Sequence, residues 1–130
     1  MPADFDGAGR RVLLVEDEFL LVLAMEEAFE GRGFAIVGPV AEVRKAETLA
    51  REAAIDAAVL NIRLRGGMVF PAVRLLLDRG IPFVFVSSES VAMPEWMPEV
   101  PRFKKHVAMG VVVDAVVRMI NQRQGARAQS

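Results

Sequence analysis

The chain has 130 residues, 53% of them hydrophobic, and its 16 basic and 17 acidic side chains leave a net charge of −1. This length suits one domain with its own hydrophobic core, and so apolar a composition excludes a disordered chain. The small net charge excludes the strongly basic surface that nucleic acid attracts, the absence of cysteine excludes disulfides, and no apolar run reaches the roughly 20 residues that span a bilayer.

The amino-terminal residues show no basic segment followed by an apolar one, so a signal peptide is not expected. Together with the absence of cysteine, this favours a cytoplasmic protein. Residues 1–10 are predicted to be a flexible leader, residues 11–122 one domain, and residues 123–130 a frayed tail.

Apolar strands and amphipathic helices alternate through the predicted domain. In chain order they are a strand at Arg11–Val15, a helix at Phe19–Phe29, a strand at Phe34–Val37, a helix at Glu42–Ala53, a strand at Ala57–Asn61, a helix at Val69–Leu77, a strand at Pro82–Val86, a strand at Phe103–Lys105 and a helix at Val111–Ile120. Gly38-Pro39 is expected to stop the second strand, and Gly66-Gly67 to form a loop after the third. Three prolines between Met93 and Pro101 allow one short turn at most between the fourth and fifth strands. The alternation predicts an α/β three-layer sandwich around a parallel sheet.

Polar residues stand at the carboxyl ends of four of the predicted strands, either as their last residues or directly after them. They are Glu16-Asp17-Glu18, Asn61, Ser87-Ser88 and Lys104-Lys105. Taken singly, each has an ordinary interpretation: acids at a helix start, a turn residue, or a solvated lysine pair. In a parallel α/β sheet, however, the carboxyl ends of the strands share one edge, where ligands bind. The sequence therefore predicts one polar site built from all four segments.

Residues 10–122 resemble the receiver domain of two-component response regulators. The segments that carry the resemblance are Val12–Glu18, Asp56–Leu64, Ser87 and Lys105. The resemblance implies a flavodoxin-like (βα)5 fold with a five-stranded parallel sheet in the order 2-1-3-4-5. It also implies a protein partner, which would be a histidine kinase, a phosphotransfer protein or a downstream effector.

The resemblance assigns a role to each residue of the site. Glu16, Asp17 and the backbone carbonyl of Arg63 would hold a magnesium ion. Ser87 and Lys105, rather than Lys104, would contact the phosphoryl group. Asn61 stands at the phospho-acceptor position, where the family has aspartate.

The amide of Asn61 is a poor phosphoryl acceptor, because resonance with nitrogen withdraws the electron density that a carboxylate oxygen offers. Phosphorylation at Asn61 is therefore expected to be disabled. The amide also removes a negative charge beside Glu16 and Asp17, and like charges about 4 Å apart cost on the order of 4 kcal/mol at an effective dielectric constant near 20. A more stable metal-free cleft and weaker magnesium binding are expected.

Two further positions depart from the family pattern. Arg102 stands where the family has a switching aromatic residue, so that switch is not expected to operate. His106 replaces the proline that usually follows the lysine, and a trans peptide is expected before it. A structural loop role is favoured for this histidine over a metal or phosphotransfer role. Together with Met93, Trp96 and Met97 in the preceding loop, Arg102 and His106 form a candidate partner surface; packing of Trp96 over the last helix is the alternative.

The function indicated is that of a stand-alone receiver-like domain in two-component (phosphorelay) signalling, which acts by protein binding and is not an enzyme. The alternative is an ordinary phospho-accepting receiver that carries an engineered Asp-to-Asn substitution or was excised from a larger regulator. A flavin-binding protein of the same fold is disfavoured, because Glu16-Asp17-Glu18 would repel a phosphate. Weak Mg²⁺ binding but no organic cofactor is expected. Neither nucleic acid nor a membrane is an expected partner, and a homodimer is left open.

Overall fold

A five-stranded parallel sheet forms the centre of the computed structural model, which describes residues 6–88 and 91–129. Its strands are β1 (Arg11–Val15), β2 (Ala35–Val40), β3 (Ala57–Leu60), β6 (Phe83–Val86) and β7 (Arg102–Phe103). They lie in the order β2-β1-β3-β6-β7, and each neighbouring pair is parallel. Because these are the first to fifth strands of the sheet along the chain, the expected order 2-1-3-4-5 is confirmed.

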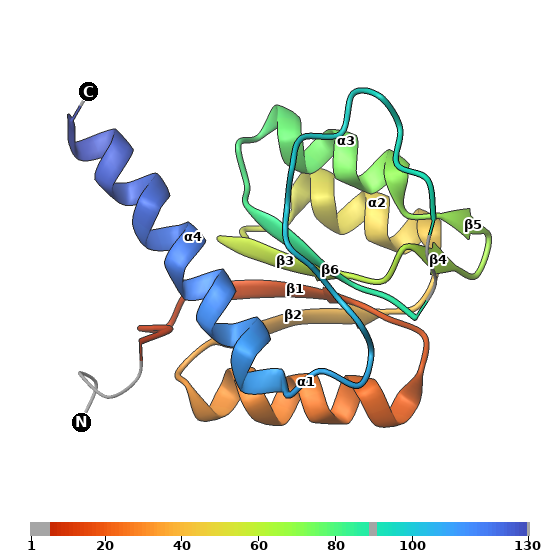
Figure 1. Ribbon diagram of the computed structural model, residues 1–130, viewed down its shortest axis with the longest axis horizontal. Helices are drawn as coiled ribbons and strands as arrows, with labels where there is room; N and C mark the ends of the chain where they lie inside the picture. Colours follow the sequence, from red (N-terminus) through yellow and green to blue (C-terminus); the bar gives the residue numbers. More distant parts are fainter. Residues whose placement is uncertain (1–5, 89–90, 130) are drawn as a thin grey trace.

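Helices cover both faces of this sheet, as Figure 1 shows. One layer holds α2 (Val43–Glu52) and α3 (Phe70–Asp78), and the other holds α1 (Phe19–Gly31) and α4 (Met109–Gln129). Each layer packs an apolar core of its own against the sheet, and the two cores share no residue. The predicted three-layer sandwich is confirmed, since alternate side chains of the central strands contribute to opposite cores.

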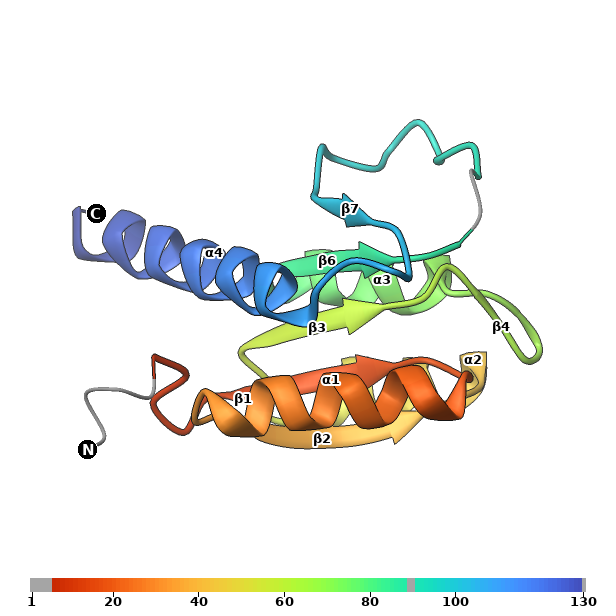
Figure 2. The same ribbon diagram turned by 60° about the horizontal axis from the view of Figure 1, so that its bottom comes forward.

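The central strands are buried on both faces, and this explains their continuous apolar sequences. Every residue of β3 and β6 is buried, as are the last four of β1. In the register, Val15 lies opposite Leu60, and Leu60 opposite Phe85, so the three strands end almost level. Figure 2 shows that they point the same way. The residues that follow them therefore meet at one edge.

Strand β2 runs through Gly38-Pro39 to Val40, although this pair was expected to stop it after Val37. The strand lies at the edge of the sheet, where the missing N–H of a proline removes no ladder hydrogen bond. A second difference is a small antiparallel hairpin of β4 (Arg63–Leu64) and β5 (Gly67–Met68), where only a loop was expected. Gly66 and Gly67 have φ values of +87° and +135°, which a glycine adopts readily and which let the chain reverse there.

The connection from β6 to β7 has no helix in its described part, which omits residues 89 and 90. It makes a single turn in which the N–H of Met97 donates to the carbonyl of Pro94 at 3.0 Å. Trp96 packs edge-on against Phe70 of α3, and the guanidinium of Arg74 lies 4.8 Å from the centre of its ring. The alternative of packing over the last helix is therefore wrong.

The described residues of both terminal segments form hydrogen bonds or helix that the sequence did not predict. Residues 6–10 are fixed to the end of α1, because Gly7 donates to the carbonyl of Arg32 and Gly9 to that of Gly33, each at 2.8 Å. A Cβ on Gly7 would lie 2.5 Å from the ring of Phe34, so only glycine allows this close approach. The described part of the predicted flexible leader is thus anchored, while residues 1–5 lie outside the described residues.

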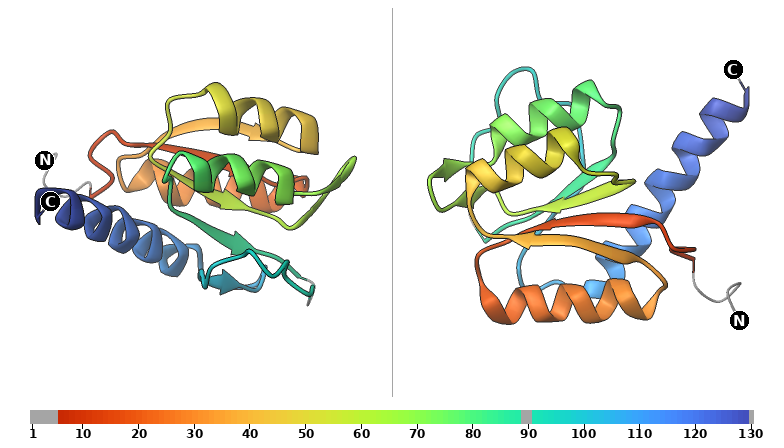
Figure 3. Two further views of the ribbon diagram at one scale, coloured as in Figure 1. Left: turned by 90° about the horizontal axis from the view of Figure 1, so that it is seen from above. Right: turned by 180° about the vertical axis from the view of Figure 1, so that it is seen from behind.

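Helix α4 continues to Gln129, whereas a helix ending near Ile120 and a frayed tail at 123–130 were expected. The expectation followed the last large apolar residue, Ile120, but the mainly polar residues that come next continue the helix. Figure 3 shows this final part of α4 extending past the sheet. Ser130 lies outside the described residues. No helix in the described parts of the chain is long and apolar enough to cross a membrane.

Candidate functional site

A cleft of about 270 Å³ lies at the edge where β1, β3 and β6 end. Its lining residues are Asp17, Asn61, Arg63, Leu64, Arg65, Ser87, Ser88 and Lys105. The backbone explains why these segments meet, since Asn61 N–H donates to Val15 at 2.8 Å and Ser87 N–H to Phe103 at 2.9 Å. Each bond joins the residue that follows one strand to a residue of the neighbouring strand. The cleft is thus a direct consequence of the strand order and register.

Glu16 lies beneath the cleft with only 1% of its surface exposed. Its Oε2 accepts the backbone N–H groups of Asp17 and Glu18, each at 3.0 Å, and lies 3.2 Å from the ammonium of Lys105. Burial raises the pKa of Glu16, although these hydrogen bonds and the lysine act in the opposite direction. Among the described residues, Glu16 Oε1 is buried without a hydrogen-bond partner.

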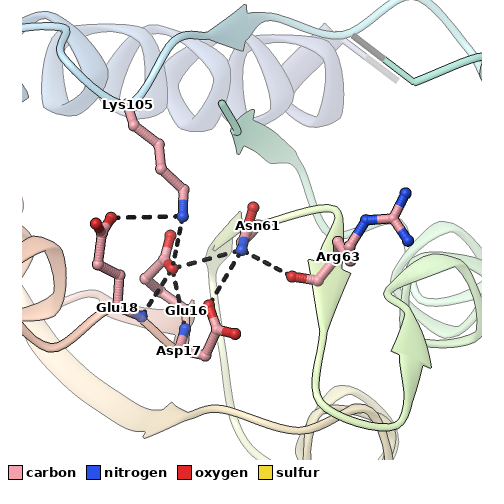
Figure 4. A network of polar contacts seen from close by, with 6 residues as sticks. All are labelled: Glu16, Asp17, Glu18, Asn61, Arg63 and Lys105. Atoms are coloured by element: carbon pink, nitrogen blue, oxygen red, sulfur yellow. Dashed lines mark hydrogen bonds and ion pairs between the residues drawn. The ribbon is translucent and has the colours of Figure 1, made fainter. Parts of the chain in front are cut away.

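Lys105 links the loop after β7 to the acidic segment after β1. Its Nζ lies 3.2 Å from Glu16 and 3.5 Å from Glu18 (Figure 4). Burial lowers the pKa of Lys105, but the attraction of the two carboxylates outweighs this effect and the net shift is upward. The adjacent Lys104 is exposed, and the lysine that pairs with Glu16 and Glu18 is Lys105. Lys105 is therefore the lysine that the fold brings into the site.

The side chain of Asn61, 5% exposed, lies between the two acids and the chain that follows β3. Its Nδ2 donates to the carbonyl of Arg63 at 2.8 Å, and lies 3.4 Å from Glu16 Oε2 and from Asp17 Oδ1. Figure 4 shows the three contacts converging on this one nitrogen, with the amide oxygen on the opposite side. The amide thus faces the acids with its donor end.

The oxygens around this nitrogen are suitable ligands for magnesium. Two carboxylates and a carbonyl are the hard ligands that Mg²⁺ prefers, and the unpartnered Oε1 of Glu16 adds an oxygen that lacks a donor. Glu16, Asp17 and the Arg63 carbonyl would hold the ion, which would neutralise negative charge at the strand ends. The described residues contain no group of three or more acidic, histidine or cysteine side chains placed to hold a metal. Of these groups, only the two carboxylates of Glu16 and Asp17 would balance the positive charge of the ion.

The candidate partner surface is only partly brought together. Met93, Met97 and Arg102 line a hollow of about 550 Å³ beside β7, and Arg102 also donates to the carbonyl of Val91 at 3.3 Å. Trp96 is not part of that hollow, since it packs on α3. His106 is exposed outside it, after a trans peptide bond.

A second exposed surface, which is apolar, was not predicted from the sequence. Phe19, Leu20 and Leu23 on the outer side of α1 are 72%, 75% and 45% exposed, while other apolar residues of α1 fill the core. The signal was present in the sequence, because the helix is apolar all round in its first two turns. A helix of that kind is normally covered on all sides.

Comparison with known proteins supports the interpretation of the fold. The chain is 33% identical to SdrG from Sphingomonas melonis Fr1, with a TM-score of 0.72 over 83% of this chain and 93% of that chain. It is 27% identical to a response regulator receiver protein from Sinorhizobium medicae WSM419, with a TM-score of 0.76 over 88% and 97%. The receiver domain of the sensor histidine kinase PA1611 from Pseudomonas aeruginosa PAO1, solved with magnesium in its active-site cleft, is 18% identical, with a TM-score of 0.74 over 87% and 98%.

No protein-family model matches the chain, and neither does any curated protein sequence. The solved structures, the strand order and the strand-end cleft nevertheless agree on one class. The chain belongs to the receiver domains of two-component response regulators.

Proposed function

We propose that this receiver domain signals by binding another protein and receives no phosphoryl group at position 61. The observation that carries the proposal is the Asn61 side chain, whose nitrogen donates to the Arg63 carbonyl and faces Glu16 and Asp17. The atom nearest the acids is therefore a hydrogen-bond donor rather than a nucleophile. The amide oxygen on the other side is a weak nucleophile, because its electrons are delocalised onto nitrogen.

Such a function requires no catalytic turnover.

The cleft and the neighbouring loop are held by contacts that are already formed. Lys105 is paired with Glu16 and Glu18, and Arg102 donates to the loop carbonyl of Val91. These contacts hold one arrangement of the cleft and its neighbouring loop. The amount of a binding partner, rather than a covalent modification, would then control the signal. We further propose a cytoplasmic location and no organic cofactor.

The outer side of α1 is the surface that we propose for this partner. Phe19, Leu20 and Leu23 are exposed there, and the helix contains acidic but no basic residues. Exposed apolar side chains with an acidic surround complement a surface that carries apolar residues and Lys or Arg. We therefore infer a partner segment of that chemistry. Two copies of this face would repel each other, which disfavours a homodimer through α1.

The hollow beside β7 is a second proposed contact region. Met93 and Met97 offer adaptable apolar contacts, and Arg102 adds a positive charge at its border. Trp96 supports this region indirectly, because its contacts with Phe70 and Arg74 attach the loop to α3. The exposed His106 lies on the loop after β7 and remains a candidate contact.

Affinity capture from cell extracts tests the proposal when the parent is compared with matched variants. We expect the parent to retain the same partner with and without a small phosphoryl donor. The double variant Leu20→Glu/Leu23→Glu should lose it, because the charges oppose burial of that face. Arg51→Glu, on the exposed side of α2 in the other layer, should retain it. A complex that forms only with the phosphoryl donor, or that is indifferent to the α1 changes, would contradict the proposal.

A further inference from the structure

Three oxygens converge on the nitrogen of Asn61, and their contacts differ in length. The Arg63 carbonyl, at 2.8 Å, receives a normal hydrogen bond, whereas Glu16 Oε2 and Asp17 Oδ1, both at 3.4 Å, receive longer ones. An amide nitrogen has two hydrogens, so one serves the carbonyl and the other is shared between the carboxylates. The same three groups are those that would hold a cation.

This convergence of oxygens is electrostatically unfavourable unless a positive group lies among them. Two carboxylates and a carbonyl whose negative ends meet in a partly buried space repel one another unless something positive lies between them. Lys105 supplies part of this positive charge from the side of Glu18, since its ammonium contacts Glu16 and Glu18. At the point between Glu16, Asp17 and Arg63, the amide of Asn61 is the donor that the structure shows.

We propose that the Asn61 amide is a built-in substitute for the divalent cation, which holds the strand-end oxygens together without a metal. The inference rests in part on the proposed function and deepens it, because the cleft is then independent of the metal as well as of phosphorylation. The substitution is incomplete, since Glu16 Oε1 keeps no hydrogen-bond partner among the described residues. Weak residual Mg²⁺ binding follows from that oxygen.

A simpler explanation would attribute any insensitivity to Mg²⁺ to the lost charge alone. The variant Asn61→Ala separates the two explanations, because alanine is as neutral as asparagine but donates no hydrogen bond. If charge alone mattered, the parent and Asn61→Ala would respond to Mg²⁺ equally. If the amide replaces the cation, Asn61→Ala leaves the oxygens without a donor and gains a response to Mg²⁺.

The test is thermal unfolding and Mg²⁺ titration of the parent, Asn61→Ala and Asn61→Asp at constant ionic strength. Millimolar Mg²⁺ should leave the Tm of the parent within about 1 °C, and should raise that of Asn61→Ala by at least about 3 °C and that of Asn61→Asp further. The apparent Kd for Mg²⁺ should be at least tenfold lower in Asn61→Ala than in the parent. In Asn61→Ala/Asp17→Ala the response should disappear, because one of the converging oxygens is gone.

Equal responses of the parent and Asn61→Ala, or a parent that binds Mg²⁺ as tightly as Asn61→Asp, would overturn the inference. Should a variant fail to fold, the side-chain NH₂ signals of Asn61 in a ¹H–¹⁵N spectrum of the parent decide the question. Between EDTA and millimolar Mg²⁺ they should shift only slightly and without saturation, as weak residual binding requires, and a shift that saturates in the low millimolar range would refute the substitution. A parent that responds to Mg²⁺ but gains no phosphoryl group would refute this inference alone and leave the proposed function standing.

Discussion

At the scale of single residues, the cleft depends on how the buried charge of Glu16 is compensated. Its Oε2 accepts two backbone N–H groups and the Lys105 ammonium, and it also lies near the Asn61 amide. The backbone donors belong to the chain itself and remain in any side-chain variant. Lys105 is the only one of these partners that brings a full positive charge, so most of the electrostatic compensation is expected from it.

Replacement of Lys105 by alanine should destabilise the fold, because it leaves the buried carboxylate of Glu16 without its counter-ion. Removing one partner of a fully buried pair costs about 3–5 kcal/mol, and the partly exposed lysine reduces our expectation to about 2–3 kcal/mol. Urea unfolding measures the change. The exposed Lys104→Ala is the matched control and should shift stability by no more than about 0.5 kcal/mol. Equal losses in the two variants would show that Glu16 does not depend on Lys105.

Strand-end residues could be located from the sequence because each follows an uninterrupted apolar segment. Glu16, Asn61 and Ser87 come directly after buried strands, and the structure places them at one edge. The direction of the Asn61 amide could not be predicted, since it depends on the Arg63 carbonyl turning back toward the cleft. That turn belongs to the β4–β5 hairpin, whose two-residue strands show no periodic pattern.

At the scale of elements, one ion-pair cluster joins three segments that lie far apart in the sequence. Arg32, at the end of α1, donates to Asp6 in the amino-terminal segment and, at 2.8 Å, to Asp114 of α4. The hydrogen bond from this guanidinium lowers the pKa of Asp6, although slight burial opposes the effect. The cluster thereby holds Asp6 against the end of α1 and links that end to α4.

A pH-dependent loss of stability is expected from Asp6. Because its pKa is lower in the folded state, its contribution is present above the ordinary value of 3.8 and is lost as the pH falls through the folded-state value. Asp6→Asn should cost about 0.2–1 kcal/mol at neutral pH, since the pair is partly exposed and screened. The difference from the parent, measured by urea unfolding, should shrink toward zero in acid. Asp78→Asn, at the exposed end of α3, is the control. A difference that persists unchanged in acid would contradict this role of Asp6.

Element boundaries were predictable where burial imposed them. β1 was placed to the residue, and β3 and β6 to within one residue, because both faces of these strands are apolar. Beyond Ile120 no large apolar residue marks the course of α4, so its continuation to Gln129 could not be expected. Gly7 and Gly9 are held at the end of α1 by backbone hydrogen bonds to residues distant in the sequence, and no local sequence pattern predicts such bonds.

At the scale of the whole molecule, the two helical layers are covered unequally. The layer of α2 and α3 also holds the loop before β7, whereas α1 and α4 lie over the other face with several apolar side chains exposed. The cleft opens at the strand ends, close to where α1 begins. A partner on α1 would thus lie beside Asp17 and Glu18. The sandwich and its strand order could be predicted from the alternation of strands and helices and from the family resemblance. The unequal coverage of the two helical layers could be seen only in the packed structure.

The absence of phosphoryl transfer at Asn61 is tested most directly by intact-mass spectrometry. The parent and Asn61→Asp would be incubated with Mg²⁺ and acetyl phosphate. The parent should keep its mass, while Asn61→Asp should gain one phosphoryl group, because Glu16, Asp17, Ser87 and Lys105 are already in place around position 61. A phosphoryl group on the parent that maps to Asn61 or to another residue of the cleft would contradict phosphorylation-independent signalling.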